Sequence, residues 1–259
     1  MAEPRVLLIV PTLGTRIAFL RQSLESIINQ DTPADLVVVC PEHAVEARSV
    51  AHQCGATVIN DPGSLPKAIN AGAAQLQPHH EFINWLGDDD LLEPGSLTTT
   101  VRTLDENPKA TVAFGACRYV DNENNELWVS RAGPWAPRIL GWGPDLIPQP
   151  GMLVRAEQWQ AVRGVDESLS MAFDLDLLLK LRRRGPLLDT GATVSSFRWH
   201  ATSLTASDRS RNLDESELVK RRYLSPRQSA MKWLWEKPVR LATRVASAEV
   251  QRRARKSTR

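Results

Sequence analysis

Short apolar runs alternate with stretches of helical spacing over the first 90 residues of the chain. Runs of β-favouring residues occupy 6–10, 36–40, 56–60 and 81–86, and polar residues follow each of them. Apolar residues recur every three or four positions over 19–28, and residues 67–76 predict another helix. Strands that alternate with helices predict an α/β fold, with a mostly parallel central sheet flanked by helices on both faces.

The second half of the chain is less regular. Residues 110–120 predict a strand, and residues 173–185 predict an amphipathic helix that Gly185 ends. The stretch 128–151 is rich in glycine and proline and contains Trp128, Trp135 and Trp142. We therefore expect an ordered loop region that covers a site.

The composition is that of an ordinary globular protein, with 42% hydrophobic and 24% charged residues. Its three cysteines, Cys40, Cys54 and Cys117, form no CxxC pair, which favours a reducing compartment. The apolar run near the N-terminus is too short for a signal-peptide core, and no segment approaches membrane-spanning length. We expect a cytoplasmic protein whose membrane contact, if it has any, is peripheral at the inner face of the cell membrane.

The charge of the chain is unevenly distributed. Residues 220–259 hold 13 Lys or Arg and two acids, a net charge of +11, whereas the formal net charge of the whole chain is +2. Residues 1–219 therefore form an acidic body with a net charge of −9. The shift in composition predicts a globular domain over 1–219 and a basic, helical C-terminal appendage over 220–259.

Sheets of this kind bind ligands outside the carboxyl ends of their strands, so the polar residues that follow each strand are candidates. These are residues 12–16, Glu42, Asp61 and, above all, Asp88, Asp89 and Asp90. Three adjacent carboxylates repel one another, and a divalent cation such as Mg²⁺ or Mn²⁺ would neutralise them. The alternative is a solvated turn that caps the next helix, and composition alone does not separate the two.

Three further candidates prove little when taken singly. Asp174 and Asp176 lie two residues apart near the start of a predicted helix, where acids are common because they interact favourably with the helix dipole. One of the two could face a cleft while the other caps the helix or pairs with an arginine. His200, a lone histidine, is more often structural than a ligand.

The order of these segments is more specific than any one of them. From about Val6 to Thr205 the chain resembles the family 2 glycosyltransferases. The resemblance is carried by VLLIVPTLGTR (6–16), SIINQ (26–30), GSLPKAINAG (63–72), WLGDDDLLEPGSL (85–97), IPQPGMLVRAEQW (147–159), GVDESLSMAFDLDLLLKLRRRG (164–185) and FRWHATSLT (197–205).

This resemblance implies a GT-A fold, with a donor half over about 1–105 and an acceptor half over about 106–219. It also implies a divalent metal, Mn²⁺ or Mg²⁺, and a UDP-, GDP- or dTDP-sugar donor. The sugar would pass with inversion to a hydroxyl of a glycan or lipid-linked acceptor, in cell-envelope glycan or glycolipid assembly.

The resemblance also assigns roles to residues. Asp174 matches the catalytic base. Metal ligation is implied for Asp89 and His200, with Asp90 in support. Gln149 matches a residue near the acceptor, and Trp142 in the predicted covering loop joins it as an acceptor candidate. The implied donor-binding residues are Pro11, Thr12, Arg16, Glu42, Asp61, Lys67, Asn70 and Asp88.

Three departures from the family pattern stand out. Cys40, Pro41 and Glu42 follow the second strand where relatives often have an acid that reads the base, so Glu42 would substitute with a shift. Gly87 stands at the usual first acid of the DXD motif, which leaves Asp88–Asp90 to hold the metal. Phe173 replaces the first acid of the family's ED pair, so only Asp174 remains.

Two alternatives belong to other classes. A nucleotidyltransferase also uses a sheet, carboxylates and a metal, but it typically has a glycine-rich loop after the first strand, and PTLGTR has one glycine. The other alternative is a non-catalytic module whose basic tail binds membrane or nucleic acid. Trp233 and Trp235 among basic residues favour an interfacial helix on anionic lipid. Nucleic acid is the weaker partner, because the acidic body would repel it.

Overall fold

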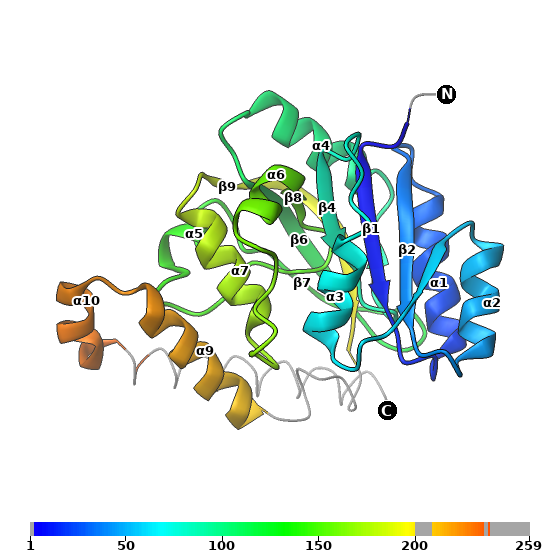
Figure 1. Ribbon diagram of the computed structural model, residues 1–259. Coiled ribbons are helices and arrows are strands. Elements are labelled where there is room, and N and C mark those ends of the chain that lie inside the picture. Colours follow the sequence, from blue (N-terminus) through cyan, green and yellow to red (C-terminus); the bar gives the residue numbers. More distant parts are fainter. Residues whose placement is uncertain (1–2, 200–208, 236–237, 239–259) are drawn as a thin grey trace.

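The computed structural model describes residues 3–199, 209–235 and 238, and a single mixed β-sheet forms its centre (Figure 1). The sheet has nine strands in the order β3-β2-β1-β4-β8-β6-β9-β5, with β7 paired to β6. The strands are β1 (Val6–Pro11), β2 (Ala34–Cys40), β3 (Thr57–Asn60), β4 (Phe82–Trp85), β5 (Leu91–Leu92), β6 (Val112–Val120), β7 (Glu126–Ser130), β8 (Leu153–Arg155) and β9 (Leu187–Arg198).

Helices lie on both faces of this sheet (Figure 1). They are α1 (Ile17–Ile28), α2 (Val45–Gln53), α3 (Leu65–Ala73), α4 (Ser96–Glu106), α5 (Ala136–Ile139), α6 (Ala156–Ala161), α7 (Phe173–Arg182), α9 (Arg209–Tyr223), α10 (Pro226–Met231) and the 3₁₀ helix η1 (Lys232–Leu234). The predicted α/β fold is confirmed. The predicted strands of the first half and the helix predicted over 19–28 lie within two residues of their observed ends, whereas the helix predicted over 67–76 ends three residues earlier, at Ala73.

Strand direction divides the sheet into two parts. The four strands β3, β2, β1 and β4 are mutually parallel, as predicted. Beyond β4, the short strand β8 runs antiparallel to both β4 and β6, and β5 and β7 add two more antiparallel pairs. β6 and β9 are parallel to each other. The second half is therefore mixed, consistent with its lack of a regular strand–helix alternation.

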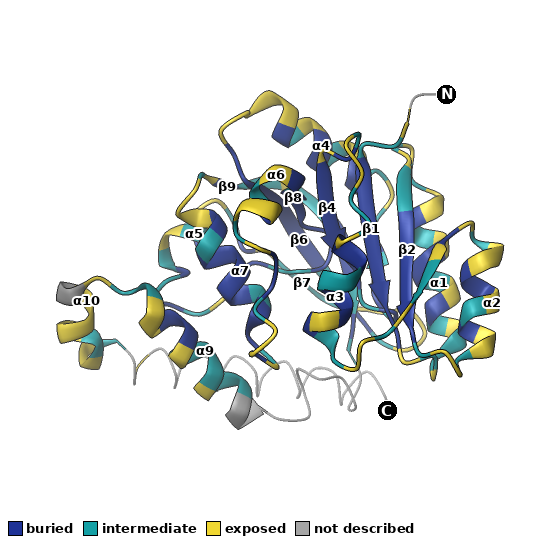
Figure 2. Ribbon diagram, viewed as in Figure 1, coloured by how far each residue is buried: buried dark blue, intermediate teal, exposed yellow. Residues whose placement is uncertain are grey.

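The buried residues form one core on each face of the sheet, and the central strands β1 and β4 are buried along their whole length (Figure 2). Alternate residues of β1 divide between the two cores, since successive side chains of a strand point to opposite faces. Leu7 and Ile9 pack with α3 and α7, whereas Val6, Leu8 and Val10 pack with α1, α2 and α4.

The helix α3 approaches β1 very closely. A Cβ atom added to Gly72 would lie 2.4 Å from Cγ2 of Ile9, so a larger residue at this position would push α3 away from the sheet. The absence of a side chain thus sets the distance between α3 and β1 on the face that carries α7.

The predicted boundary between residues 219 and 220 falls inside α9. Val219 is completely buried and Lys220 is nearly so, and the last turns of α9 pack against α7. Within the described residues, no helix is both long enough and apolar enough to cross a membrane. Residues 239–259, most of the predicted basic appendage, lie outside the described part.

Candidate functional site

The three adjacent aspartates lie in the turn that follows β4, beside the end of β1. The two strands run parallel, and the chain after β4 stays on β1 through a hydrogen bond from Leu86 N to Ile9 O. Asp88 and Asp90 are each only 5% exposed. The hydroxyl of Thr12, directly after β1, donates to Asp88 Oδ2 over 2.5 Å. Thr12 and Asp88 therefore meet at the carboxyl edge of the sheet.

Arg16 links two of these carboxylates from the start of α1. Its Nη1 donates to Asp89 Oδ2 over 2.5 Å, and its Nη2 pairs with Asp88 Oδ1. Oxygens of two adjacent aspartates therefore lie close enough to share one cation. The side chain of Arg16 is about one-third exposed, so this guanidinium can also meet an anionic ligand at the same edge.

The cluster carries more negative charge than its surroundings favour. Burial raises the pKa of Asp88, although Thr12 and Arg16 oppose this. The pKa of Asp90 is raised well above its usual range, first by burial and then by the charge of Asp89. Such a set of hard oxygen atoms, short of positive charge, fits a divalent ion such as Mg²⁺ or Mn²⁺.

Gly87 leaves room for the carboxylates of this turn. A Cβ atom at this position would lie 2.7 Å from Asp90 Oδ2 and 3.1 Å from Asp89 Oδ1. The residue that departs from the family pattern is thus the one whose missing side chain lets Asp89 and Asp90 fold back over the turn.

Arg198, at the end of β9, supports the same turn and was not predicted. Its backbone N–H donates to Asp90 Oδ1 over 3.1 Å, and its buried guanidinium donates to the carbonyl of Asp89 and to Gln22. The sequence signal for Arg198 was its place two positions before His200, a predicted metal ligand. His200, the predicted third metal ligand, lies outside the described residues.

Asp174 occupies the first turn of α7 and is partly buried. Burial raises the pKa of its carboxyl to about 6, the N–H of Leu175 lowers it, and the charge of Glu215 raises it further. Asp145, in the loop after α5, is close enough for the two charges to repel. Its pKa rises to about 7 through partial loss of hydration and the charge of Asp174, with Lys220 acting in opposition.

Asp176 has a different environment from Asp174, as their spacing predicted. Its side chain is 1% exposed and forms an ion pair with Lys180 at 2.8 Å. It also accepts a hydrogen bond from the hydroxyl of Tyr223 on α9 over 2.7 Å. Asp176 is therefore held by structural contacts, whereas Asp174 keeps the raised pKa of a candidate base.

Two predicted site residues bind neighbouring segments to each other. Gln149 donates to the carbonyl of Trp85 over 2.7 Å, which places the 143–151 loop against the end of β4. The amide of Asn70 donates to Val165 O and accepts from Val165 N, so Asn70 connects α3 to the turn before α7. Their predicted contacts with acceptor and donor stay predictions.

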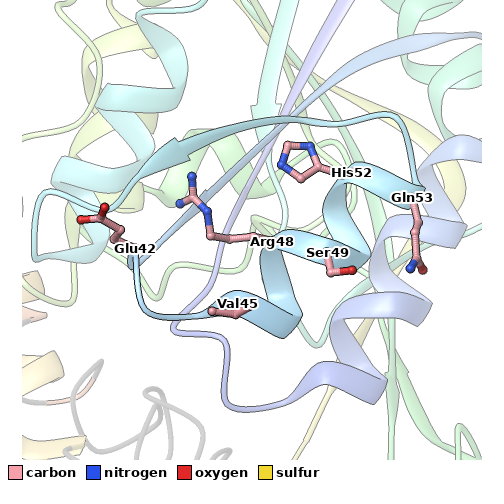
Figure 3. A pocket seen from close by; sticks show the side chains of 6 residues that line it. All are labelled: Glu42, Val45, Arg48, Ser49, His52 and Gln53. Atoms are coloured by element: carbon pink, nitrogen blue, oxygen red, sulfur yellow. The ribbon is translucent and has the colours of Figure 1, made fainter.

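The remaining predicted donor residues lie along the same edge. Pro11 ends β1, Asp61 follows β3 and accepts a hydrogen bond from Gly63 N, and Lys67 is exposed on α3. Glu42 lies on the loop before α2, where it lines an open hollow of about 690 Å³ together with residues of α2 (Figure 3). Arg48 in this hollow donates to Asn60 at the end of β3.

Trp142, the predicted acceptor residue, lies at the junction with the C-terminal helices. It is 40% exposed, and its ring meets that of Trp235 edge-on with 6.5 Å between centroids. Lys220 and Arg221 of α9 line the small cavity beside it. Trp142 therefore lies beside α9 and Trp235.

A cluster of Asp35, His79 and His80 lies at the opposite edge of the sheet, where β2 begins and β4 is about to begin. Gln77 N donates to His80 Nδ1, so in the neutral ring Nε2 carries the proton and donates to Asp35 over 2.9 Å. Burial lowers the pKa of His80, in agreement with a neutral ring. A metal would need the Nε2 lone pair, so hydrogen bonding accounts for this cluster.

Comparisons with known proteins agree on one family. The model of the family described as "Glycosyltransferase like family 2" matches residues 4–135, about half of the chain. No curated protein sequence matches at a significant level.

Solved structures extend the similarity to most of the chain. The mannosyltransferase PcManGT from Pyrobaculum calidifontis, in complex with GDP-Man and Mn²⁺, is 16% identical with a TM-score of 0.65, and the match covers 96% of this chain and 76% of that one. S. aureus TarS 1–349 in complex with UDP-GlcNAc is 16% identical with a TM-score of 0.63, and the match covers 88% and 69%. The chain therefore has the GT-A fold that the sequence predicted.

Proposed function

Because this chain belongs to the glycosyltransferase-like family 2, we propose that it transfers a sugar from a nucleotide-diphosphate donor to an acceptor hydroxyl with inversion, in a reaction that depends on Mn²⁺ or Mg²⁺. The observation that carries this proposal is the buried turn of Asp88, Asp89 and Asp90, bound to Thr12 and Arg16 at the carboxyl edge of the parallel strands. UDP-GlcNAc and GDP-Man in similar structures support a nucleotide-sugar donor.

Asp89 and Asp90 would hold the metal together with His200, and Asp88 would lie beside the donor. When bound, the ion would supply Lewis-acid stabilisation of the negative charge that develops on the leaving diphosphate. Arg16 already contacts two of these carboxylates, so its guanidinium is placed to meet phosphate oxygens at the same edge.

Asp174 would take the proton from the acceptor hydroxyl as that oxygen attacks the anomeric carbon from the face opposite the diphosphate. Its raised pKa of about 6 suits this role, since a base works best when its pKa lies near the working pH. A single displacement of this kind inverts the anomeric configuration. Gln149, held at the end of β4, would lie on the acceptor side.

The acceptor we propose is a glycan or lipid-linked hydroxyl, in cell-envelope glycan or glycolipid assembly at the inner face of the membrane. Support comes from the C-terminal region, where Met231, Trp233 and Leu234 are 51%, 70% and 46% exposed. Thirteen Lys or Arg lie in residues 220–259. Exposed aromatic and aliphatic side chains among basic residues are typical of segments that bind anionic lipid surfaces.

Donor-dependent thermal stabilisation tests the proposed donor and metal. The melting temperature would be measured with UDP-GlcNAc, GDP-mannose and a dTDP-sugar, each with MnCl₂ or with EDTA. A donor at 100 times its Kd stabilises the folded state by about 2.7 kcal/mol. We expect one donor to raise the melting temperature with Mn²⁺, and Asp89→Asn to lose that effect. Equal stabilisation in EDTA, or none by any donor, would contradict the proposal.

A further inference from the structure

Glu215 reaches from α9 to the segment directly before α7, 45 residues earlier in the sequence. Its carboxylate accepts hydrogen bonds from three consecutive backbone N–H groups, those of Ser170 (3.0 Å), Met171 (2.5 Å) and Ala172 (2.7 Å). Its Oε1 also accepts a hydrogen bond from the Ser170 hydroxyl over 3.2 Å. One side chain therefore fixes the complete turn that leads into α7.

This arrangement has a clear physical basis. Consecutive backbone N–H groups that converge form a concave site for an anion, and a carboxylate from elsewhere in the chain fills it here. Bonds from N–H groups to a charged acceptor are about twice as strong as neutral ones. Ala172 is the N-cap of α7 and Asp174 is its second residue, so the position of Asp174 depends on this turn.

Further contacts hold α9 in place, so that Glu215 acts from a fixed support. Val219 is buried in the core, the Tyr223 hydroxyl donates to Asp176, and Arg222 pairs with Asp166 at 2.8 Å. These contacts lie toward the C-terminal end of the helix and do not involve the turn at 170–172. The attachment of α9 and the hold on the turn can therefore be separated by mutation.

We infer that Glu215 is a positioning residue for Asp174. Through Glu215, α9 holds the start of α7 in the position in which the Asp174 carboxylate meets the acceptor. This inference rests on the proposed role of Asp174 as the base. Glu215 acts on the reaction through the turn, since its carboxylate is bound to backbone N–H groups.

The charges around Asp174 supply a second signature of this role. Within the described part of the chain, Asp145 from the loop after α5 and Glu215 from α9 are acids whose charges interact with Asp174, and Lys220 acts on Asp145. The charge of Glu215 raises the pKa of Asp174. Removal of that charge should therefore lower this pKa, and the acid limb of the activity profile should move to lower pH.

The test compares Glu215→Ala, Glu215→Gln, Tyr223→Phe and Asp174→Asn with the wild-type protein. Tyr223→Phe is the matched control, because it removes a hydrogen bond between α9 and α7 and leaves the turn at 170–172 untouched. Two quantities would be measured. The first is amide hydrogen exchange at Ser170, Met171 and Ala172. The second is donor hydrolysis, in which water replaces the acceptor hydroxyl, followed as Mn²⁺-dependent release of UDP or GDP from UDP-GlcNAc or GDP-mannose across pH 5–8.

In Glu215→Ala we expect amide exchange of the turn to rise at least about 10-fold, and donor hydrolysis to fall about 10- to 100-fold with the donor KM within about two-fold. Glu215→Gln keeps an acceptor oxygen, so its activity should fall less and its acid limb should shift to lower pH. Tyr223→Phe should behave as wild type in both measurements.

Unchanged exchange in Glu215→Ala, or full hydrolysis by Glu215→Ala when Asp174→Asn is inactive, would overturn this inference alone. Full hydrolysis by Asp174→Asn would overturn the proposed base and the inference with it. An equal loss in Tyr223→Phe would show that α9 contributes only general stability, which also contradicts a positioning role for Glu215.

Discussion

Substitution of Gly87 by alanine tests the geometry of the aspartate turn. The new Cβ would lie 2.7 Å from Asp90 Oδ2, whereas ordinary contacts begin at 3.4 Å. The Asp90 carboxylate must therefore move by about 0.7 Å, and Asp89 Oδ1, at 3.1 Å, by about half as much. Metal–ligand distances tolerate changes of about 0.2 Å, so this displacement exceeds what a metal site can accept.

We expect Gly87→Ala to weaken Mn²⁺ binding by at least about 10-fold, since loss of a supporting contact around a metal site commonly costs about 10- to 100-fold in affinity. The fold should survive. Overpacking of this size costs about 1–3 kcal/mol, which is less than the stability of a typical domain.

The assay is a calorimetric titration of Mn²⁺ into protein saturated with UDP or GDP. Gly141→Ala is the matched control, because its Cβ would meet Arg182 Nη1 at 3.4 Å and no closer atom. We expect the control to bind Mn²⁺ as the wild type does. Equal Mn²⁺ affinity in Gly87→Ala and wild type would refute the assignment of Asp89 and Asp90 as ligands.

The proposed metal ligands, the proposed base and the basic tail can each be tested by substitution. Asp89→Asn and His200→Ala should each weaken Mn²⁺-dependent donor binding at least about 10-fold, because each removes a proposed ligand; unchanged affinity in both would exclude the proposed metal site. Wild-type activity should rise as pH increases through about 6, where Asp174 loses its proton, and Asp174→Asn should lose about 10²- to 10⁴-fold in transfer at nearly unchanged donor affinity. Trp233→Ala, and truncation after Tyr223 more strongly, should reduce co-sedimentation with anionic vesicles at low salt, where each basic residue contributes about 1 kcal/mol; equal sedimentation would show that the tail is only solvated.

The sequence predicted the elements whose pattern is local. The first two strands contain continuous apolar runs and the fourth is apolar apart from Asn84, because these strands are buried on both faces, and the ends of the first and fourth strands place Thr12 and Asp88 at one edge. The hydrogen bond between Thr12 and Asp88 depends in addition on β1 and β4 being neighbours, which the structure shows.

The sequence could not predict contacts that depend on tertiary packing. In the sequence, Arg198 is an ordinary arginine at the end of a strand. The packing of β9 in the sheet is what places it within hydrogen-bonding distance of Asp89 and Asp90. Glu215 lies in a helix whose composition is strongly polar, and nothing in its local pattern indicates a bond to residues 170–172. A charge count alone also placed the boundary at 219/220, whereas the buried Val219 and Lys220 belong to a helix that continues to Tyr223.

Metal-dependent sugar transfer at this site is tested most directly by the release of UDP or GDP from a nucleotide sugar by the purified protein, measured with MnCl₂ and with EDTA for wild type, Asp89→Asn and Asp174→Asn. We predict that the wild type releases UDP or GDP with MnCl₂ and does not release it with EDTA. Asp89→Asn should lose both release and donor binding, and Asp174→Asn should lose release but keep donor binding. Release that is equal in EDTA, or that survives in both variants, would contradict a metal-dependent sugar transfer at this site.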